Sequence, residues 1–442
     1  MARRFISLPF RATALLPVAM LWAAASLFSH TASAQAPQGS LADRLKAVQS
    51  GQADSKGPAA LPAWKPVTPG ASAAAIPVVK GLKVVTAITD PAGDYESIKS
   101  IEDVDAVTVR LHVSADKPAP KLGGLLGSGP GGVADAKNES PDKMECLRVV
   151  DVADLAKAHS YSELFCENKV EHFPDSTAIS ASTEMLNQLR AGQPAEFQFM
   201  PDNKFAAFIQ LGAQVSGKKS GQATLTPHAG QQMYSCTLHR VGATDVAVPV
   251  LLNDQRVELP ALHATCTLDD NEEVHVYYLD QPANPLTLAF QLGAVDTRLQ
   301  VIKITVPPPE AAKSPAAGGG SPMEQALAAK QPVDVYGIYF DFNSATIKPE
   351  SEAVLRQIAD IMRKNPDWKL SVSGHTDNIG GDPVNLALSQ RRAAAVKDAL
   401  VTRYPITADR LATSGYGASS PLESNATLEG RARNRRVELR RQ

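Results

Sequence analysis

Residues 374–380 read Gly-His-Thr-Asp-Asn-Ile-Gly, and a helix carrying Arg392 is predicted to follow them. The segment Trp368–Ser373 directly before this stretch alternates apolar and polar residues and predicts a strand, so Asp377 falls in the turn after that strand. A carboxylate and a guanidinium at one edge of a sheet can bind the ammonium and carboxylate of a single amino-acid head group. The stretch therefore predicts a binding site for a zwitterionic ligand.

Strand and helix patterns alternate around this stretch. Pro349 begins a segment with apolar residues at helical spacing, which Asn365-Pro366 ends, and Pro383 begins a second such segment. The order strand, helix, strand, helix, strand, helix, strand predicts a small α/β sandwich with helices packed on a sheet. The predicted strands are 335–342, 368–373, 410–415 and 436–439, and the predicted helices are 349–364, 382–400 and 427–434.

Residues 333–442 resemble the OmpA-like peptidoglycan-binding domain that forms the C-terminal part of many envelope proteins. The resemblance rests on several separated motifs in one order, whereas the region upstream resembles no family that we identify. The motifs are Phe-Asp-Phe-Asn at 340–343, Gly-His-Thr-Asp at 374–377 with Gly380, Asn385, Leu388-Ser389, Arg392-Ala393, Gly-Arg-Ala at 430–432 and Asn-Arg-Arg-Val at 434–437.

The resemblance implies non-covalent binding of the diaminopimelate in peptidoglycan stem peptides. It places Asp377 on the ammonium of the ligand and Arg392 on its carboxylate, with Asn343 and Leu388 as further contacts. It implies no catalytic residue, no metal and no cofactor. The remaining expected site residues are Thr376, Asn385 and Arg435.

Two other functions are conceivable for residues of this region. His375 beside Asp377 could be a metal ligand or a general base, but no second ligand cluster or nucleophile accompanies it, so a loop residue is favoured. The arginine-rich end at 430–441 could bind nucleic acid. Val437 and Leu439 alternate with charged residues there, which favours a last strand, and the net charge of −2 marks no nucleic-acid binder.

The N-terminus predicts export. Arg3, Arg4 and Arg11 flank an apolar segment that leads to Ala-Ser-Ala at 32–34, the pattern of a signal peptide over residues 1–34. A transmembrane anchor is the alternative, but the segment is short and contains Pro17, and no later stretch predicts an integral membrane span. We expect a periplasmic, cell-wall-associated protein, with outer-membrane association left open.

The four cysteines, Cys146, Cys166, Cys236 and Cys266, suit an exported protein with disulfides. Three pairings are possible, and the pairs Cys146–Cys166 and Cys236–Cys266 are favoured because neighbours in sequence close first. A zinc site is disfavoured because no two of them have CxxC spacing.

Upstream of the C-terminal module the chain has three parts. Residues 35–75 predict a flexible lead, 76–306 a β-rich, sandwich-like region, and 307–332 a linker rich in Pro, Ala and Gly. Segments such as Val104–Val113, Phe205–Leu211 and Val257–Thr267 are the predicted strands, while 152–159 and 182–189 predict helices. A faint repeat around the cysteines raises the possibility of two subdomains, 76–215 and 216–306.

Three functions fit this multidomain organisation. The first is a non-enzymatic exported protein that binds peptidoglycan and tethers a β-rich module of unassigned role to the wall. The options for that role are mechanical linkage, recruitment of an envelope protein partner and envelope assembly. The second is a wall-anchored enzyme with its activity in 76–306, although neither HExxH nor GxSxG occurs. The third is an outer-membrane barrel with a periplasmic tail, against which the irregular strand spacing argues.

Overall fold

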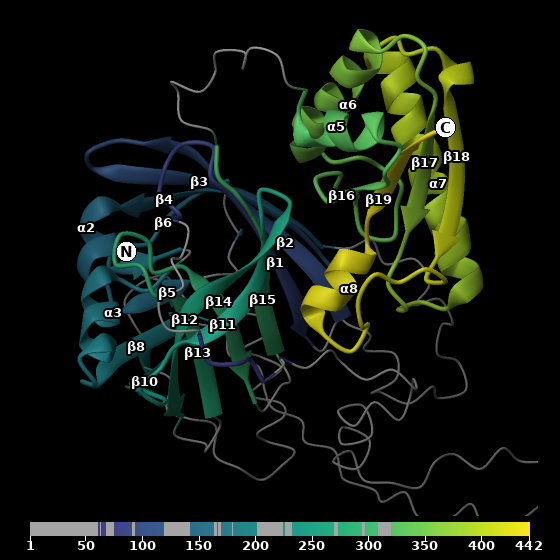
Figure 1. Ribbon diagram of the computed structural model, residues 1–442. Coiled ribbons are helices and arrows are strands. Elements are labelled where there is room, and N and C mark those ends of the chain that lie inside the picture. The colour runs from purple at the N-terminus through teal and green to yellow at the C-terminus, as the bar shows by residue number, and fades with distance from the viewer. Residues whose placement is uncertain are drawn as a thin grey trace, which may run out of the picture. The chain divides into compact units, whose positions relative to one another are not determined.

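The computed structural model in Figure 1 describes residues 61, 63–67, 75–90, 93–118, 142–162, 166, 169–178, 180–200, 224–225, 232–268, 273–293, 297–307 and 320–442. All of them lie in one compact unit, Leu41–Gln442. The predicted signal peptide, most of the predicted lead, the predicted strand at 205–211 and residues 308–319 of the predicted linker lie outside the described residues. No helix in the described ranges has the length and apolarity needed to cross a membrane.

The region before residue 307 is β-rich, as predicted. Its strands follow one hydrogen-bonded path, β6-β4-β3-β2-β1-β15-β14-β13-β12-β10-β8-β5-β7, with β9 paired to β10. The strands are β1 (Lys83–Asp90), β2 (Gly93–Val104), β3 (Thr108–Lys117), β4 (Asp142–Asp151), β5 (Ser160–Ser162), β6 (Val170–His172), β7 (Ser176–Thr177), β8 (Ala195–Met200), β9 (Thr224–Leu225), β10 (Gln232–Arg240), β11 (Val246–Leu252), β12 (Gln255–Thr267), β13 (Glu273–Leu279), β14 (Thr287–Leu292) and β15 (Thr297–Thr305).

Strand β11 closes part of this path into a ring. It pairs antiparallel with β12 along its whole length and parallel with β15 at Leu251–Lys303 and Leu252–Ile304. Strand β12 pairs with β13, β13 with β14, and β14 with β15. The two pairings of β11 therefore close the strands β11 to β15 into a ring. Position 215 is the boundary between the two subdomains that the sequence leaves possible. Two strand pairings, β1 with β15 and β8 with β10, join residues on either side of it.

One predicted strand is divided by a turn. The alternation over 104–113 predicts a continuous strand, whereas β2 ends at Val104 and β3 begins at Thr108. Asp105 Oδ1 accepts hydrogen bonds from the backbone N–H groups of Val107 and Thr108 at 2.8 and 2.7 Å. An Asp side chain that satisfies the backbone in this way favours a turn over a strand.

Two short helices lie within the β-rich region, where the sequence predicts them. They are α2 (Val152–Lys157) and α3 (Thr183–Arg190). The Ser182 hydroxyl accepts a hydrogen bond from Met185 N at 3.2 Å and so caps α3. Met185, Leu186 and Leu189 are buried with the aromatic residues of β8, β10 and β14, so α3 covers one end of the larger apolar core.

Both predicted disulfides are present in the structure. Cys146 of β4 is bonded to Cys166, and Cys236 of β10 is bonded to Cys266 of β12. The second bond joins strands that pair only at His239–Thr265 and Arg240–Ala264. The covalent link therefore holds β10 against β12 where few backbone hydrogen bonds do.

The C-terminal module has the predicted order of strands and helices, but its first strand, β16, covers Val333–Val335 and not the predicted range 335–342. Its sheet has the strand order β16-β19-β17-β18, with β17 and β18 parallel and the other pairs antiparallel. The elements are β16 (Val333–Val335), α6 (Glu352–Lys364), β17 (Leu370–His375), α7 (Asp382–Arg403), β18 (Leu411–Gly417), α8 (Leu428–Asn434) and β19 (Val437–Arg441).

One helix lies in the range assigned to the linker. Helix α5 (Pro322–Ala328) begins after Ser321, whose hydroxyl accepts a hydrogen bond from Glu324 N at 3.2 Å. Leu327 is fully buried in the same apolar core as α6, α7 and the sheet. The folded module therefore begins before residue 333.

We predict that replacing both Cys236 and Cys266 by Ala lowers the free energy of unfolding by about 3 kcal/mol, because the unfolded chain loses a loop constraint. Urea denaturation under oxidising conditions measures the change. Ser235→Ala, at an exposed neighbour on β10, is the control and should change stability by less than about 0.5 kcal/mol. An unchanged midpoint in the double variant would contradict the prediction.

Candidate ligand-binding site

The loop after β17 positions Asp377. Thr376 N donates to Gly417 O at 3.0 Å, and the Thr376 hydroxyl donates to Asp377 O at 2.9 Å. Asp377 Oδ1 accepts from Ile379 N at 2.9 Å, which closes a tight turn. Asn385 on α7 donates its side-chain N–H to the carbonyls of Asp377 and Ile379, at 3.1 and 2.9 Å. Thr376 and Asn385 therefore fix the loop that presents the carboxylate.

Two glycines allow α7 to approach the sheet closely. A Cβ at Gly374 would lie 2.2 Å from Ser389 O, and a Cβ at Gly415 would lie 2.4 Å from Gln390 N. Both contacts are with helix backbone, which cannot move aside as a side chain would. The Ser389 hydroxyl also accepts a hydrogen bond from Gly417 N at 2.9 Å. This packing sets the position of the helical turn that carries Leu388 and Arg392.

Arg392 reaches from α7 toward the segment that follows β16. Its Nε donates to Ser344 O at 3.0 Å, and its guanidinium lies 4.8 Å from the centre of the Phe340 ring. Burial, followed by the charge of Arg435, lowers the pKa of Arg392 to about 10, so the group stays charged at neutral pH. Its two terminal nitrogens form no hydrogen bond within the part of the chain that the structure describes.

The carboxylate of Asp377 has a basic partner in Arg435. Arg435 Nη1 lies 2.6 Å from Asp377 Oδ2, while Nη2 and Nε of Arg435 lie 2.5 and 3.1 Å from Glu96 Oε1 on β2. Burial alone would lower the pKa of Arg435, but the charges of Glu96 and Asp377 outweigh it and raise that pKa. Arg435 is therefore shared between two carboxylates.

The seven predicted site residues converge in space. All of them line one cavity of about 370 Å³. Asn343 lies in a turn with φ of 49°, and Leu388 gives the cavity an apolar wall with Phe340. The seven are Asn343, Thr376, Asp377, Asn385, Leu388, Arg392 and Arg435.

Two contributors to the cavity carry no predicted role. Phe340 belongs to the motif at 340–343, which is the signal in the sequence that could have pointed to the contact of its ring with Arg392. Glu96 lies on β2, 339 residues before the arginine it contacts, and no local pattern in the sequence marks it.

His375 is the last residue of β17 and not a loop residue. Its ring stacks on Tyr416 with centres 5.2 Å apart, and the residue is 4% exposed. Neither ring nitrogen has a hydrogen-bond partner among the described residues. Burial, followed by the charge of Arg436, lowers the pKa of His375 to about 4.

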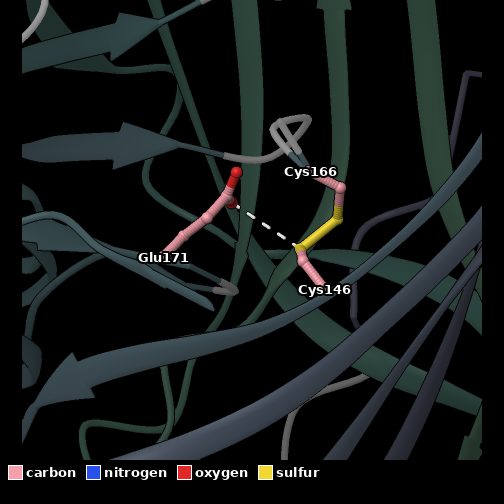
Figure 2. A group of neighbouring side chains, drawn as sticks. All are labelled: Cys146, Cys166 and Glu171. Atoms are coloured by element: carbon pink, nitrogen blue, oxygen red, sulfur yellow. Dashed lines mark hydrogen bonds between the residues drawn. A yellow bond between two sulfur atoms is a disulfide. The ribbon is translucent and has the colours of Figure 1, made fainter. Parts of the chain in front are cut away.

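One group of side chains in the described ranges has the spacing of metal ligands: Cys146, Cys166 and Glu171, shown in Figure 2. The two sulfurs are joined in a disulfide, which leaves no thiolate to bind a metal. Glu171 Oε2 lies 3.6 Å from Cys146 Sγ and accepts from Arg148 Nη2 at 2.8 Å. This group is a buried ion pair beside a disulfide.

Comparison with known proteins identifies the class of this module. Residues 339–435 match the OmpA family, so the C-terminal module is an OmpA-family domain. The resemblance seen in the sequence is thereby confirmed.

Particular relatives share only this part of the chain. Outer membrane porin F of Pseudomonas aeruginosa is 46% identical over 101 residues, which cover 23% of this chain and 29% of the porin. Peptidoglycan-binding protein ArfA of Mycobacterium tuberculosis is 42% identical over 102 residues, which cover 23% of this chain and 31% of ArfA. The chain thus spans about a third of the length of these curated relatives.

Among solved structures, the peptidoglycan-associated lipoprotein of Burkholderia pseudomallei is 31% identical. It covers 26% of this chain and 92% of its own, with a TM-score of 0.23.

We predict that Gly374→Ala destabilises the protein by about 2–3 kcal/mol, because the new methyl group meets helix backbone and α7 must shift. Urea denaturation measures the effect. Ser371→Ala on the same strand is the control, since it removes atoms and adds none. Equal stability of Gly374→Ala and wild type would show that α7 does not press on β17.

A second prediction concerns acid stability. The folded protein holds His375 neutral down to pH of about 4, whereas an unfolded His titrates near pH of about 6.5. This contribution to stability is therefore fully present above pH of about 6.5 and is lost as the pH falls toward 4. Between pH 7 and pH 5, His375→Phe should lose about 1–2 kcal/mol less stability than wild type.

Urea denaturation at both pH values tests this expectation. His112→Phe serves as the control because His112 is only half-buried on β3. Identical losses in wild type and His375→Phe would mean that the His375 ring takes up its proton in the folded state as it does in the unfolded chain.

Proposed function

We propose that this protein binds peptidoglycan without covalent attachment, through the diaminopimelate of the stem peptides. The observation that carries the proposal is one cavity that holds the Asp377 carboxylate and the free terminal nitrogens of Arg392. Diaminopimelate ends in an ammonium and a carboxylate on one carbon. A carboxylate alone would accept many amines, whereas a guanidinium at a fixed distance also requires the acid and can bind it through two parallel hydrogen bonds.

The relatives support this proposal for the C-terminal module. One of them is named a peptidoglycan-binding protein, and others are named outer membrane proteins or porins. We propose the same setting for this chain: export to the periplasm, with attachment to the cell wall. The head group of the ligand contacts one carboxylate and one guanidinium, so each site binds modestly and many sites on a polymeric wall add avidity.

For the β-rich region we propose a binding role and no catalysis. Its buried residues are chiefly apolar, and the described part contains two disulfides and a large hydrogen-bonded sheet. A rigid sheet of this kind suits the docking of another envelope protein. The protein would then connect that partner to the wall.

We predict that Asp377→Ala or Arg392→Ala weakens binding to purified sacculi at least tenfold, because each removes one half of the contact with the amino-acid head group. Co-sedimentation at moderate ionic strength measures the loss. Asp382→Ala and Arg391→Ala are matched controls, since both residues are exposed on α7 near the site. Wild-type binding by both site variants would exclude this site.

The same assay tests the ligand itself. A soluble stem peptide with diaminopimelate should displace the wild-type protein from sacculi, and the peptide with lysine at that position should not, because it lacks the second carboxylate. Equal displacement by the two peptides would show that the protein does not recognise the diaminopimelate head group.

A further inference from the structure

Three carboxylates lie on one face of strands β2 and β3. Asp94 and Glu96 are two residues apart on β2, and their side chains therefore point to the same face of the sheet. Ser97 pairs with Ala115, which brings Asp116 of β3 opposite Glu96 and onto that face. We name these three residues the acidic face.

Each member of the acidic face contacts the OmpA-family domain. Asp94 Oδ2 lies 2.5 Å from Arg431 Nη2, and Arg431 is 2% exposed. Asp116 Oδ2 lies 2.9 Å from Lys348 Nζ and accepts from Phe342 N at 3.1 Å. These partners come from both ends of the domain sequence, so the acidic face matches a basic surface of the folded domain.

Glu96 holds the position of most consequence, because its partner belongs to the ligand site. A single oxygen of Glu96 accepts from both Nε and Nη2 of Arg435, while Arg435 Nη1 binds Asp377. Arginine uses this edge of its guanidinium to bind carboxylates. The Glu96 side chain also lines the cavity that holds Arg392. Glu96 therefore places a carboxylate of the protein itself in the cavity proposed for the ligand, on the arginine that also holds Asp377.

The apolar contact beside these ion pairs is limited. It joins Val85, Ile98 and Ile302 of the β-rich region to Tyr339, Leu428 and Ala432 of the domain. This cluster is smaller than the apolar core on either side of it. Among the ion pairs of the acidic face, that of Glu96 with Arg435 keeps the most exposure, 26% and 22% of the two side chains, whereas Arg431 and Asp116 are buried. A ligand that draws Arg435 away from Glu96 therefore competes with the most solvent-exposed of these pairs.

We propose that Glu96 is an internal ligand of the peptidoglycan site, so that docking of the acidic face and binding of the wall exclude each other. The inference rests on the proposed function, since it assigns the regulation of the same site. In the open state the acidic face has left the domain, and the ligand binds this state. The apparent affinity is then the intrinsic affinity multiplied by the fraction of protein in the open state. By reciprocity, saturation of the site with ligand releases β2 and β3 from the domain.

The test uses the full mature chain and a soluble diaminopimelate-containing stem peptide. Glu96→Ala should bind this peptide about tenfold more tightly than wild type, as expected if the open form is about a tenth of the population. Glu145→Ala is the matched control, because Glu145 is an exposed carboxylate on β4, and its affinity should equal that of wild type. Isothermal titration calorimetry gives the three affinities.

Hydrogen exchange provides a second measurement on wild type alone. Saturation with the peptide should speed amide exchange in residues 93–104 and leave exchange in β13 unchanged. Unchanged exchange in 93–104, or an affinity of Glu96→Ala equal to or below that of wild type, overturns the inference. A lower affinity would mean that Glu96 contributes to ligand binding.

These outcomes separate the inference from the proposed function. If wild type or Glu96→Ala binds the peptide and Asp377→Ala does not, the peptidoglycan site stands, and the comparison of affinities decides the role of Glu96. If wild type, Glu96→Ala and Glu145→Ala all fail to bind the peptide and sacculi, the proposed function fails, and the inference fails with it.

Discussion

The ligand site depends on how closely helix α7 lies against strands β17 and β18. Gly374 and Gly415 leave no side chain between the strands and the helix backbone, and the Ser389 hydroxyl bonds to the backbone of Gly417. Any larger residue at either glycine would move the helix outward. Because Asp377 belongs to the strand side and Arg392 to the helix side, this one contact sets the distance between the two charges. Figure 1 shows α7 running beside the two strands.

A second constraint is the sharing of charges within the site. Asp377 is 7% exposed and uses one oxygen for Ile379 N and the other for Arg435. Arg392 is held by Ser344 O and by the face of Phe340, and among the described residues its terminal nitrogens have no hydrogen-bond partner. The two arginines thus differ in what they offer, because one is engaged by carboxylates of the protein and the other is positioned but not neutralised.

The C-terminal module is recognisable in the sequence because its strands, turns and helices carry local patterns. The seven residues that the resemblance to OmpA-like domains assigns to the site line one cavity of the folded chain, and their role in binding stays a prediction. Both disulfides were also predictable, since in each bond the partners are neighbours among the four cysteines.

Other features depend on contacts between distant residues and leave no local pattern. Glu96 looks like any polar residue of a half-buried strand, and only the folded chain brings it to Arg435. Helix α5 lies within an Ala-rich segment, where Leu327 alone is fully buried and the apolar period is too short to read. The alternation of Val107 with its neighbours concealed the turn that Asp105 makes.

The pairing of β15 has a mechanical consequence. This strand is the last one before the OmpA-family domain, and it is hydrogen-bonded to β14 and β1 along its sides and to β11 near its end. A pull transmitted through residue 307 acts along β15, so the bonds to its neighbours are loaded together in shear and are not opened one after another. A chain held at the wall by one end can therefore resist tension at the strand where that tension enters the β-rich region.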